Sequence, residues 1–275
     1  MAFLPDQEIT ASWQWKLARV CLYLPARWFW KWSCIGEEKL PTKGGYLVIN
    51  FHTTHNHDIL LHMFGFNERT GRVSRALFHR GLMAIWPGLR YLGGVPGYRH
   101  TANQLIRAGF CAACIPGGAD EMITGHEHSY DLQWPSKRKG FAACALKTGC
   151  PIVPSFMRNG EEMKFNPVFW LANMMRLHKL FALGVKLPLV GRIIYTGGIY
   201  IAFCLAWLTA IPVPVQVTTV IGDPIIAKPG ETLDELVARS KESLQSLIRQ
   251  HHPTGHKSYS RALRERWSGS KQKAQ

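Results

Sequence analysis

The feature that most constrains the fold of this chain is an alternation of short apolar runs with longer, helix-like segments. The apolar runs are bounded by glycine, proline or polar residues, which is the pattern of buried strands. We expect strands within residues 44–51, 72–79, 110–115, 151–157 and 213–225. Helices are expected at 58–66, 100–109, 139–149 and 231–252. Strand–helix alternation of this kind builds an α/β domain.

The helix at 231–252 has the clearest local signals. Thr232 and Glu235 have the spacing of a capping box, in which each side chain accepts a hydrogen bond from the backbone N–H of the other residue. Apolar residues then recur every three or four positions, so one face of this helix should pack on a core.

Length and charge narrow the possible partners. The 275 residues suffice for one large domain, and 47% hydrophobic residues exclude a disordered chain. Lys and Arg number 33 against 18 Asp and Glu, a formal net charge of +15, and there are 10 Trp. A basic, Trp-rich chain indicates either nucleic acid or an anionic membrane surface as partner. The basic residues form no recognisable nucleic-acid motif, which favours a lipid membrane and argues against nucleic acid.

The seven cysteines are too sparse and irregular for a disulfide scaffold, so reduced thiols in a cytosol-facing compartment are expected. Cys111 and Cys114 have the C-x-x-C spacing of zinc or redox sites. They lie in a buried-strand pattern without a second pair of this kind, and we interpret them as core residues.

Residues 1–35 interleave tryptophan and aliphatic residues with lysine and arginine. The segment lacks the pattern of a cleaved signal peptide, and its charges come too often for a spanning helix, which needs about 20 apolar residues. Tryptophan beside basic side chains is typical of an amphipathic helix that lies in the membrane interface. The alternative is a terminal helix that packs on the domain through its aromatic face.

A second apolar feature is the uncharged stretch between Arg192 and Asp223. As a helix, residues 193–211 would extend over about 28 Å, close to the thickness of a hydrocarbon core. Pro212 and Pro214 end any such helix. The segment is therefore either a transmembrane or re-entrant helix or a buried core helix.

The candidate chemistry lies in FHTTHNHD at residues 51–58. The predicted strand ends at Phe51 and is followed by His52, and Asp58 comes six positions later at a predicted helix start. A carboxylate beside a histidine holds the imidazole tautomer and stabilises the imidazolium formed when the histidine takes a proton. His52 is therefore a candidate general base, with Asp58 as its partner.

A metal site is the rival interpretation of the same segment. His55, His57, Asp58 and His62 resemble the T-H-x-H-x-D-H motif of metallo-hydrolases, and imidazole with carboxylate suits zinc. Here, however, Asp58 directly follows His57, and no later cluster of His, Asp or Cys completes such a site. A His/Asp metal-dependent hydrolase is the alternative from a different class of enzyme.

Further motifs follow the His52–Asp58 segment. They are Pro116-Gly117-Gly118 with Glu121, the basic block Arg138-Lys139-Gly140-Phe141, and Pro151-Ile152-Val153-Pro154. In this order and spacing, the chain resembles the glycerolipid acyltransferase superfamily, which includes the lysophosphatidic acid acyltransferases. It is most similar to the branch that contains type 2 diacylglycerol acyltransferases and transmembrane protein 68. The resemblance covers residues 36 to 250 approximately.

The chain departs from the superfamily at the first motif. Most members have four residues between the histidine and the aspartate, and Thr53 stands where that histidine would be. Five residues separate His52 from Asp58 here, as in transmembrane protein 68. We take His52 as the base, with His55 as the fallback.

The resemblance implies direct acyl transfer without a covalent enzyme intermediate. His52 would deprotonate an acceptor hydroxyl, which attacks the carbonyl of an activated donor, most commonly acyl-CoA, while Asp58 orients His52. Backbone N–H groups at Gly117 and Gly118 are suited to stabilise the oxyanion. Acyl-CoA would be a co-substrate, and no cofactor or metal is expected.

Substrate-binding roles also follow from the resemblance. Arg99, at the position of the second motif, together with Arg138 and Lys139 would bind phosphates of CoA or lipid. Glu121 would position the acceptor or cap the next helix. The glycine-rich third motif lacks the Thr-Arg pair of the phosphate-binding version. This favours mono- or diacylglycerol as acceptor over the alternative, a lysophospholipid or lysophosphatidate.

We therefore expect an α/β fold with a mixed, largely parallel sheet flanked by helices, and membrane-associated helices at the N-terminus and within the chain. The predicted parts are an interface segment at 1–35, an acyltransferase domain at 36–252 and a basic tail at 253–275, which is either solvated or in contact with the membrane. The active site would face the cytosol, at the endoplasmic reticulum of a eukaryote or the inner membrane of a bacterium.

The topology of residues 193–211 follows from the same resemblance. The strands before and after this segment should share one sheet, so a single crossing would place them on opposite sides of the bilayer. We expect one of two arrangements for residues 193–211. The segment is one half of a re-entrant hairpin, with the apolar stretch 165–190 as the other half, or it is a helix embedded in one leaflet.

Overall fold

A seven-stranded sheet forms the centre of the molecule, in the strand order β1-β9-β6-β2-β5-β3-β4. The computed structural model describes residues 3–55, 57–118, 120–121 and 129–268. The strands are β1 (Ser33–Ile35), β2 (Tyr46–Asn50), β3 (Arg75–Phe78), β4 (Gly94–Pro96), β5 (Cys111–Cys114), β6 (Ile152–Arg158) and β9 (Thr218–Ile221). Neighbouring strands are parallel except β6 and β9, which are antiparallel. The predicted mixed, largely parallel sheet is confirmed, with β1 and β4 as additional edge strands.

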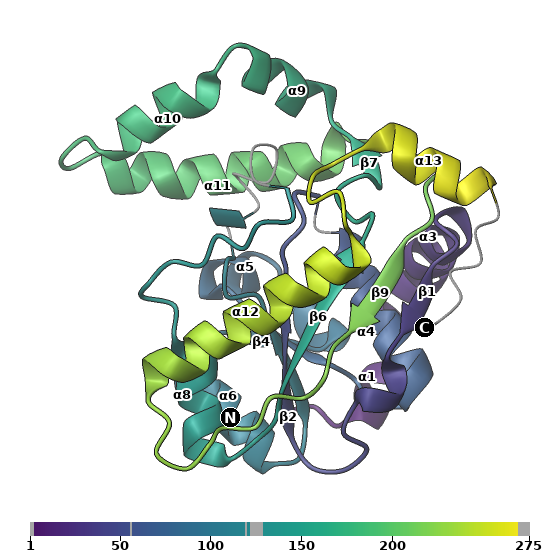
Figure 1. Ribbon diagram of the computed structural model, residues 1–275, viewed down its shortest axis with the longest axis vertical. Helices are drawn as coiled ribbons and strands as arrows, with labels where there is room; N and C mark the ends of the chain where they lie inside the picture. Colours follow the sequence, from purple (N-terminus) through teal and green to yellow (C-terminus); the bar gives the residue numbers. More distant parts are fainter. Residues whose placement is uncertain (1–2, 56, 119, 122–128, 269–275) are drawn as a thin grey trace.

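The strands carry apolar side chains on both faces of the sheet, so helices must cover both faces. Leu47 and Ile49 of β2 pack in one core with α6 (Arg99–Arg107), α8 (Gly140–Thr148) and α12 (Leu233–His251). Val48, which points to the opposite face, packs towards Phe66 of α4 (His57–Thr70). Figure 1 shows α12 lying across the sheet. The predicted capping box of Thr232 and Glu235 is present at the start of α12.

Smaller helices connect these elements. α5 (Arg80–Ile85) and the 3₁₀ helix η3 (Pro87–Leu92) lie between β3 and β4, and the 3₁₀ turn η2 (Glu37–Lys39) follows β1. Gly149, the last residue of the helix expected at 139–149, ends α8 in the left-handed conformation with φ of 70°, which glycine adopts readily.

The N-terminal segment has one buried and one exposed side. It consists of α1 (Asp6–Ala11), α2 (Trp13–Ala18), the π-helical turn η1 (Arg19–Tyr23) and α3 (Leu24–Phe29). Trp15, Tyr23 and Trp30 are buried in one core cluster with Phe64 of α4. On the outer side, Trp13 is 69% exposed and Trp28 is 80% exposed. The segment thus packs on the domain through part of its aromatic surface, and the rest of that surface faces outwards.

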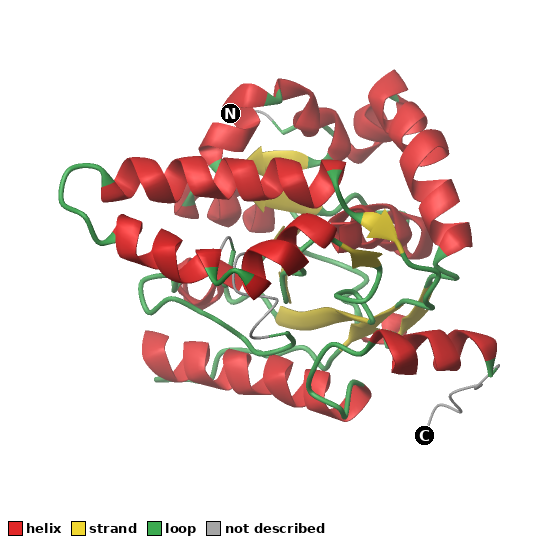
Figure 2. Cartoon of the chain, turned by 90° about the horizontal axis from the view of Figure 1, so that it is seen from above, coloured by secondary structure: helices red, strands yellow, loops and turns green. Residues whose placement is uncertain are grey.

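Three helices between β6 and β9 form a hairpin at one end of the molecule (Figure 1). They are α9 (Pro167–Met174), α10 (Leu177–Val185) and α11 (Gly191–Leu208), and the short antiparallel pair β7 (Lys164–Phe165) and β8 (Ile211–Pro212) closes their base. Seen from above in Figure 2, α11 runs beside the other helices of the hairpin. α11 is long and apolar enough to cross a membrane, and 12% of it is buried. Arg158 at the end of β6 pairs with Thr218 of β9, so the strands on either side of the hairpin share one sheet, as expected.

Part of the predicted basic tail is a helix that docks on the domain. In α13 (Tyr259–Trp267), Ala262 is fully buried. Arg261 forms ion pairs with Glu162 at 3.1 Å and with Glu265 at 2.9 Å, and Glu265 also pairs with Arg158 at 2.7 Å. These contacts attach α13 to the end of β6 and to the loop that follows it.

Candidate active site

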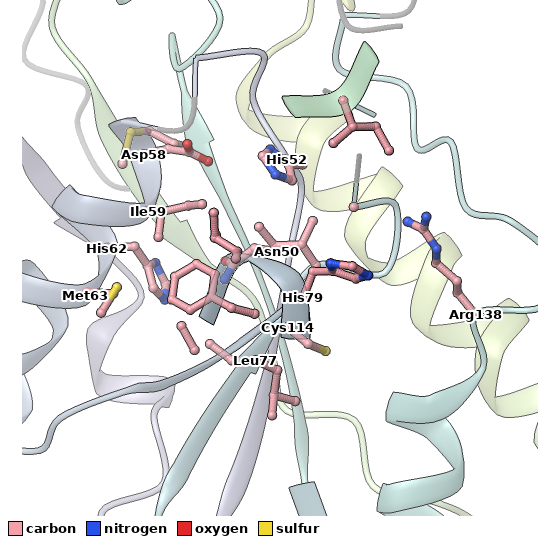
Figure 3. A pocket seen from close by; sticks show the side chains of 18 of the residues that line it. Asn50, His52, Asp58, Ile59, His62, Met63, Leu77, His79, Cys114 and Arg138 are labelled. Atoms are coloured by element: carbon pink, nitrogen blue, oxygen red, sulfur yellow. The ribbon is translucent and has the colours of Figure 1, made fainter. Parts of the chain in front are cut away.

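A cavity of about 470 Å³ opens beyond the carboxyl ends of β2, β3 and β5. These strands are adjacent and parallel, so the residues that follow them meet at one edge of the sheet, where α/β folds commonly bind ligands. His52 follows β2, His79 follows β3 and Gly118 lies in the loop after β5. Figure 3 shows Asp58 and His62 on one side of the cavity, Arg138 on the other, and His52 between them. Residues of α11 supply a further wall.

His52 is held in the tautomer that a general base needs. Its side chain is buried, and Nδ1 lies 2.9 Å from the carbonyl oxygen of Thr53. A carbonyl only accepts hydrogen bonds, so Nδ1 carries the proton and Nε2 is the nitrogen that can take one. Burial lowers the pKa of His52, and the nearby Asp58 carboxylate opposes this shift. His52 is therefore neutral near pH 7, which is the form that accepts a proton.

Asp58 lies in the first turn of α4 and is 6% exposed. Its Oδ1 accepts a hydrogen bond of 2.6 Å from the Thr53 hydroxyl. Burial raises the pKa of Asp58, while His52 and the hydrogen bonds from Thr53 oppose that rise. Among the hydrogen bonds of the described residues, none joins Asp58 directly to His52. Thr53 contacts both residues, with its carbonyl oxygen at His52 and its hydroxyl at Asp58.

Two buried glutamates hold the backbone on either side of Thr53. Glu121 accepts hydrogen bonds from the backbone N–H of His52 at 3.0 Å and of Gln133 at 3.2 Å. Glu161 accepts one from the backbone N–H of Thr54 at 2.9 Å. Burial raises the pKa of Glu121 to about 8 and that of Glu161 to about 7. The structure thus places Glu121 behind His52, against its backbone.

The sequence patterns did not single out Glu161. Only its position in the chain could have indicated a role, because Glu161 follows the carboxyl end of β6, the strand next to β2. Residues that follow adjacent parallel strands gather at the same edge of the sheet, so a carboxylate there was a candidate neighbour of His52.

The glycine-rich loop carries the cationic side of the cavity. Gly118 lines the cavity, with φ of +52°, and Gly117 is buried behind it, where its carbonyl accepts a hydrogen bond from Arg138. Arg138 also forms an ion pair with Asp120 at 2.8 Å. Asp120 accepts a hydrogen bond of 3.0 Å from the Tyr195 hydroxyl of α11. The hairpin is therefore connected to the loop that faces His52.

Two of the predicted phosphate-binding residues lie outside the cavity. Arg99 begins α6 and is exposed, and Lys139 precedes α8 and pairs with Asp234 of α12. The aliphatic part of the Arg99 side chain lies beside Gly140, so Arg99 and Lys139 share the surface formed by the N-terminal ends of α6 and α8.

The remaining histidines of the segment separate in space. His55 is buried and its ring faces that of Phe169, at a centroid distance of 6.5 Å. His62 lines the cavity one turn after Asp58, and burial lowers its pKa to about 4. The side chain of His57 lies outside the described residues. Within the described part of the chain, no three His, Cys, Asp or Glu side chains form a group that could hold a metal ion. Cys111 is buried in β5, and Cys114 lines the cavity.

Comparison with known proteins gives both sequence relatives and a fold relative. Residues 89–263 match the family model of "Diacylglycerol acyltransferase". The "DGAT1/2-independent enzyme synthesizing storage lipids" of Mus musculus is 30% identical over 220 residues, which cover 78% of this chain and 59% of that protein. The Homo sapiens protein of the same name is 29% identical, covering 78% of this chain and 60% of that protein.

A more distant relative is "Diacylglycerol O-acyltransferase 2-like protein 6" of Mus musculus. It is 26% identical over 245 residues, covering 77% of this chain and 67% of that protein. The chain spans 58% of the length of the Gallus gallus and Bos taurus storage-lipid relatives. In fold, the chain is similar to the crystal structure of the 1-acyl-sn-glycerophosphate (LPA) acyltransferase, PlsC, from Thermotoga maritima. The TM-score is 0.51 at 15% identity, over 89% of this chain and 86% of that one.

Proposed function

Because this chain belongs to the diacylglycerol acyltransferase family, we propose that it is a membrane-associated O-acyltransferase. It moves a fatty acyl group from an activated donor, acyl-CoA, to the hydroxyl of a glycerolipid. The observation that carries this proposal is the site itself: His52 presents an unprotonated Nε2 beside a largely apolar cavity at the carboxyl edge of the sheet. No metal takes part in the proposed reaction.

The reaction begins with the acceptor hydroxyl at His52. Nε2 takes the hydroxyl proton as the oxygen attacks the thioester carbonyl carbon. The resulting tetrahedral intermediate then expels the CoA thiolate, which takes the proton back from His52. General-base catalysis of this kind contributes about 10²- to 10⁴-fold. The backbone N–H of Gly118, at the cavity wall, is the candidate donor to the oxyanion.

The charges around the cavity favour an uncharged acceptor. Arg138 is the one Lys or Arg among the described residues that line it, and Asp120 neutralises that charge. A lysophosphatidate would bring a phosphate that needs an uncommitted cation. A mono- or diacylglycerol brings a hydroxyl and acyl chains, which suit an apolar cavity. With diacylglycerol the product is triacylglycerol. Outside the cavity, the exposed Arg99 is suited to the phosphates of CoA, and Lys139 would join it only by leaving its ion pair with Asp234.

The exposed surface of the helical hairpin supports residence at a membrane. Its outward-facing residues include Trp170, Met174, Leu180, Leu183, Ile193 and Leu208, each of them more than half exposed. Large apolar side chains that are exposed together on one element indicate an interaction site. Other residues of α11, Tyr195 and Ile199 among them, line the cavity. α11 thus separates the cavity from the proposed lipid phase, and the hairpin lies in one leaflet with both of its ends at the sheet.

An acyl-transfer assay tests the proposed activity. Membranes or detergent-purified protein are incubated with labelled acyl-CoA and, in turn, monoacylglycerol, diacylglycerol and lysophosphatidate. The wild type should acylate a neutral glycerolipid, and His52→Ala should lose nearly all turnover. His256 is exposed and is not among the residues that line the cavity, so His256→Ala is the matched control and should remain active. Preference for lysophosphatidate would refute the neutral acceptor. Ester hydrolysis that a chelator abolishes would refute the acyltransferase in favour of a metal-dependent hydrolase.

A flotation assay tests the membrane surface separately. Wild-type protein should float with phosphatidylcholine vesicles that contain an anionic lipid, and Trp170→Glu/Leu183→Glu should float less. Leu146→Glu, at an exposed leucine of α8, serves as the control for a new surface charge. Equal flotation of the hairpin variant and the wild type would contradict the proposed orientation.

A further inference from the structure

We propose that Thr53 is a positioning residue that connects Asp58 to His52, so that these three residues act as one unit. The inference rests on the proposed function, in which His52 is the general base. It concerns the residue at which this chain departs from the superfamily spacing of histidine and aspartate. The role assigned to Thr53 comes from its two contacts and its burial.

Thr53 contacts both partners with different groups. Its hydroxyl donates to Asp58 Oδ1 at 2.6 Å, and its carbonyl oxygen accepts from His52 Nδ1 at 2.9 Å. The side chain is fully buried, so water does not compete for either contact. A hydroxyl-to-carboxylate bond of this length belongs to the strong, charge-assisted class. Movement of the Asp58 carboxylate is therefore transmitted to the peptide that orients the His52 ring.

The extra residue in the motif explains why a hydroxyl is needed at this position. His52 already uses its Nδ1–H on the Thr53 carbonyl, so it has no second donor on that nitrogen for Asp58. A buried carboxylate without donors is costly. The Thr53 hydroxyl supplies one donor, beside the backbone N–H groups of Thr53 and Ile59 that also stabilise the carboxylate. Valine, which has the same shape, could not replace the hydroxyl.

The backbone around Thr53 is fixed on both sides. Glu121 binds the N–H of His52 and Glu161 binds the N–H of Thr54, each within 3.0 Å. With both flanking amides held, the Thr53 peptide has little freedom to compensate for a lost hydroxyl. Rate is sensitive to such small displacements of a base, because a shift of about 1 Å can cost 10²-fold.

The central test compares Thr53→Val with Thr53→Ser. Thr53→Val should lower kcat on the order of 10- to 100-fold with little change in KM, because a hydrogen bond to a charged group is lost while substrate contacts stay. Thr53→Ser keeps the hydroxyl and should recover most of the rate. Thr101→Val removes a buried hydroxyl from α6, away from the cavity, and should leave kcat unchanged. Full activity of Thr53→Val, or equal loss in Thr53→Ser, would overturn the proposal.

A double variant separates a shared role from two independent ones. If Thr53 acts through Asp58, Thr53→Val/Asp58→Ala should lose no more rate than Asp58→Ala alone. If the rate loss of the double variant equals the product of the two single-variant losses, the two residues act separately.

Spectroscopy decides the inference even if the acyl-transfer assay fails with every acceptor, an outcome that would refute only the proposed function. In ¹⁵N-histidine spectra, with His52→Ala identifying the signal, wild-type His52 should show the Nδ1–H tautomer. Among the described residues, Asp58 from α4 and Arg138 before α8 are the charged groups that act on the His52 ring, and Glu121 from the loop after β5 is a titratable group that contacts the His52 backbone N–H. All three are unchanged in Thr53→Val. Loss of the hydroxyl makes Asp58 harder to ionise, so the pKa of His52 should fall in Thr53→Val and stay unchanged in Thr101→Val. A His52 pKa that is the same in Thr53→Val and wild type would refute the coupling.

Discussion

A methyl group at position 117 should damage both the stability and the activity of the protein. An ideal Cβ on Gly117 would lie 1.9 Å from Cδ and 2.3 Å from Cγ of Glu121, closer than any real contact between carbon atoms. Gly117→Ala therefore forces Glu121 aside. The carboxylate that moves is the one that accepts the backbone N–H groups of His52 and Gln133.

The magnitude follows from what is lost. Leaving a buried N–H without its acceptor costs about 1–3 kcal/mol, and overpacking a core typically costs ~1–3 kcal/mol more. We therefore expect Gly117→Ala to lose about 2–6 kcal/mol of folding free energy. Because a displacement of about 1 Å at the base costs on the order of 10²-fold in rate, the folded fraction should turn over about 100 times more slowly.

Thermal unfolding in detergent and the single-turnover rate with labelled acyl-CoA measure the two effects. Gly88→Ala is the matched control, because nothing lies within 4 Å of its Cβ position, and it should resemble wild type. Adding Gly117→Ala to Glu121→Ala should cause little further loss of stability, since the clashing side chain is gone. Wild-type stability and rate in Gly117→Ala itself would refute the packing of Glu121 behind His52.

Three further predictions concern the same site. Burial raises the pKa of Glu121 from 4.5 to about 8, so the folded state retains a proton that the unfolded chain releases, and stability falls as pH rises through this window. Glu121→Gln should reduce that slope by about 1 kcal/mol per pH unit, measured by unfolding between pH 5 and 8. Arg138→Ala removes an ion pair with Asp120 in which the two side chains are 37% and 34% exposed. It should cost at most ~1 kcal/mol of stability and lower the initial rate of acyl transfer. A large loss of stability would instead show that Arg138 has a structural role. Cys114→Phe should narrow the cavity and slow long-chain acyl-CoA more than short-chain acyl-CoA, and equal slowing would contradict chain binding there.

The sequence could predict the elements that carry their own periodicity. β2, β5, β6 and α12 have apolar patterns and terminating residues that specify them locally, and His52 could be placed because it follows β2 directly. β1 and β4 have three residues each, too few to show a periodic pattern. β1 also pairs only with β9, a strand far away in the chain, whereas β4 pairs with β3, the strand that precedes it.

The contacts within the site were harder to foresee than its location. Thr54 and Glu161 are 107 positions apart, and their hydrogen bond exists only because β2 and β6 are neighbours in the sheet. In the N-terminal segment, the aromatic residues divide between core and surface, with Trp15 inside and Trp13 outside. Both residues are tryptophan and have the same intrinsic preference for burial, so only the packing of the folded chain decides which of them is buried.

The helical hairpin leaves and rejoins the sheet at a single paired position, Arg158 with Thr218. Antiparallel neighbours can be joined by a turn as short as two residues, so strand pairing sets no required length for the segment between them. Descendants of this fold can therefore lengthen, shorten or exchange the hairpin without shifting the register of β6 and β9. Every such exchange also rebuilds the cavity wall that α11 provides. If the cavity binds the acyl acceptor as proposed, the choice of acceptor can change with the hairpin while the edge of the sheet that holds His52 stays the same.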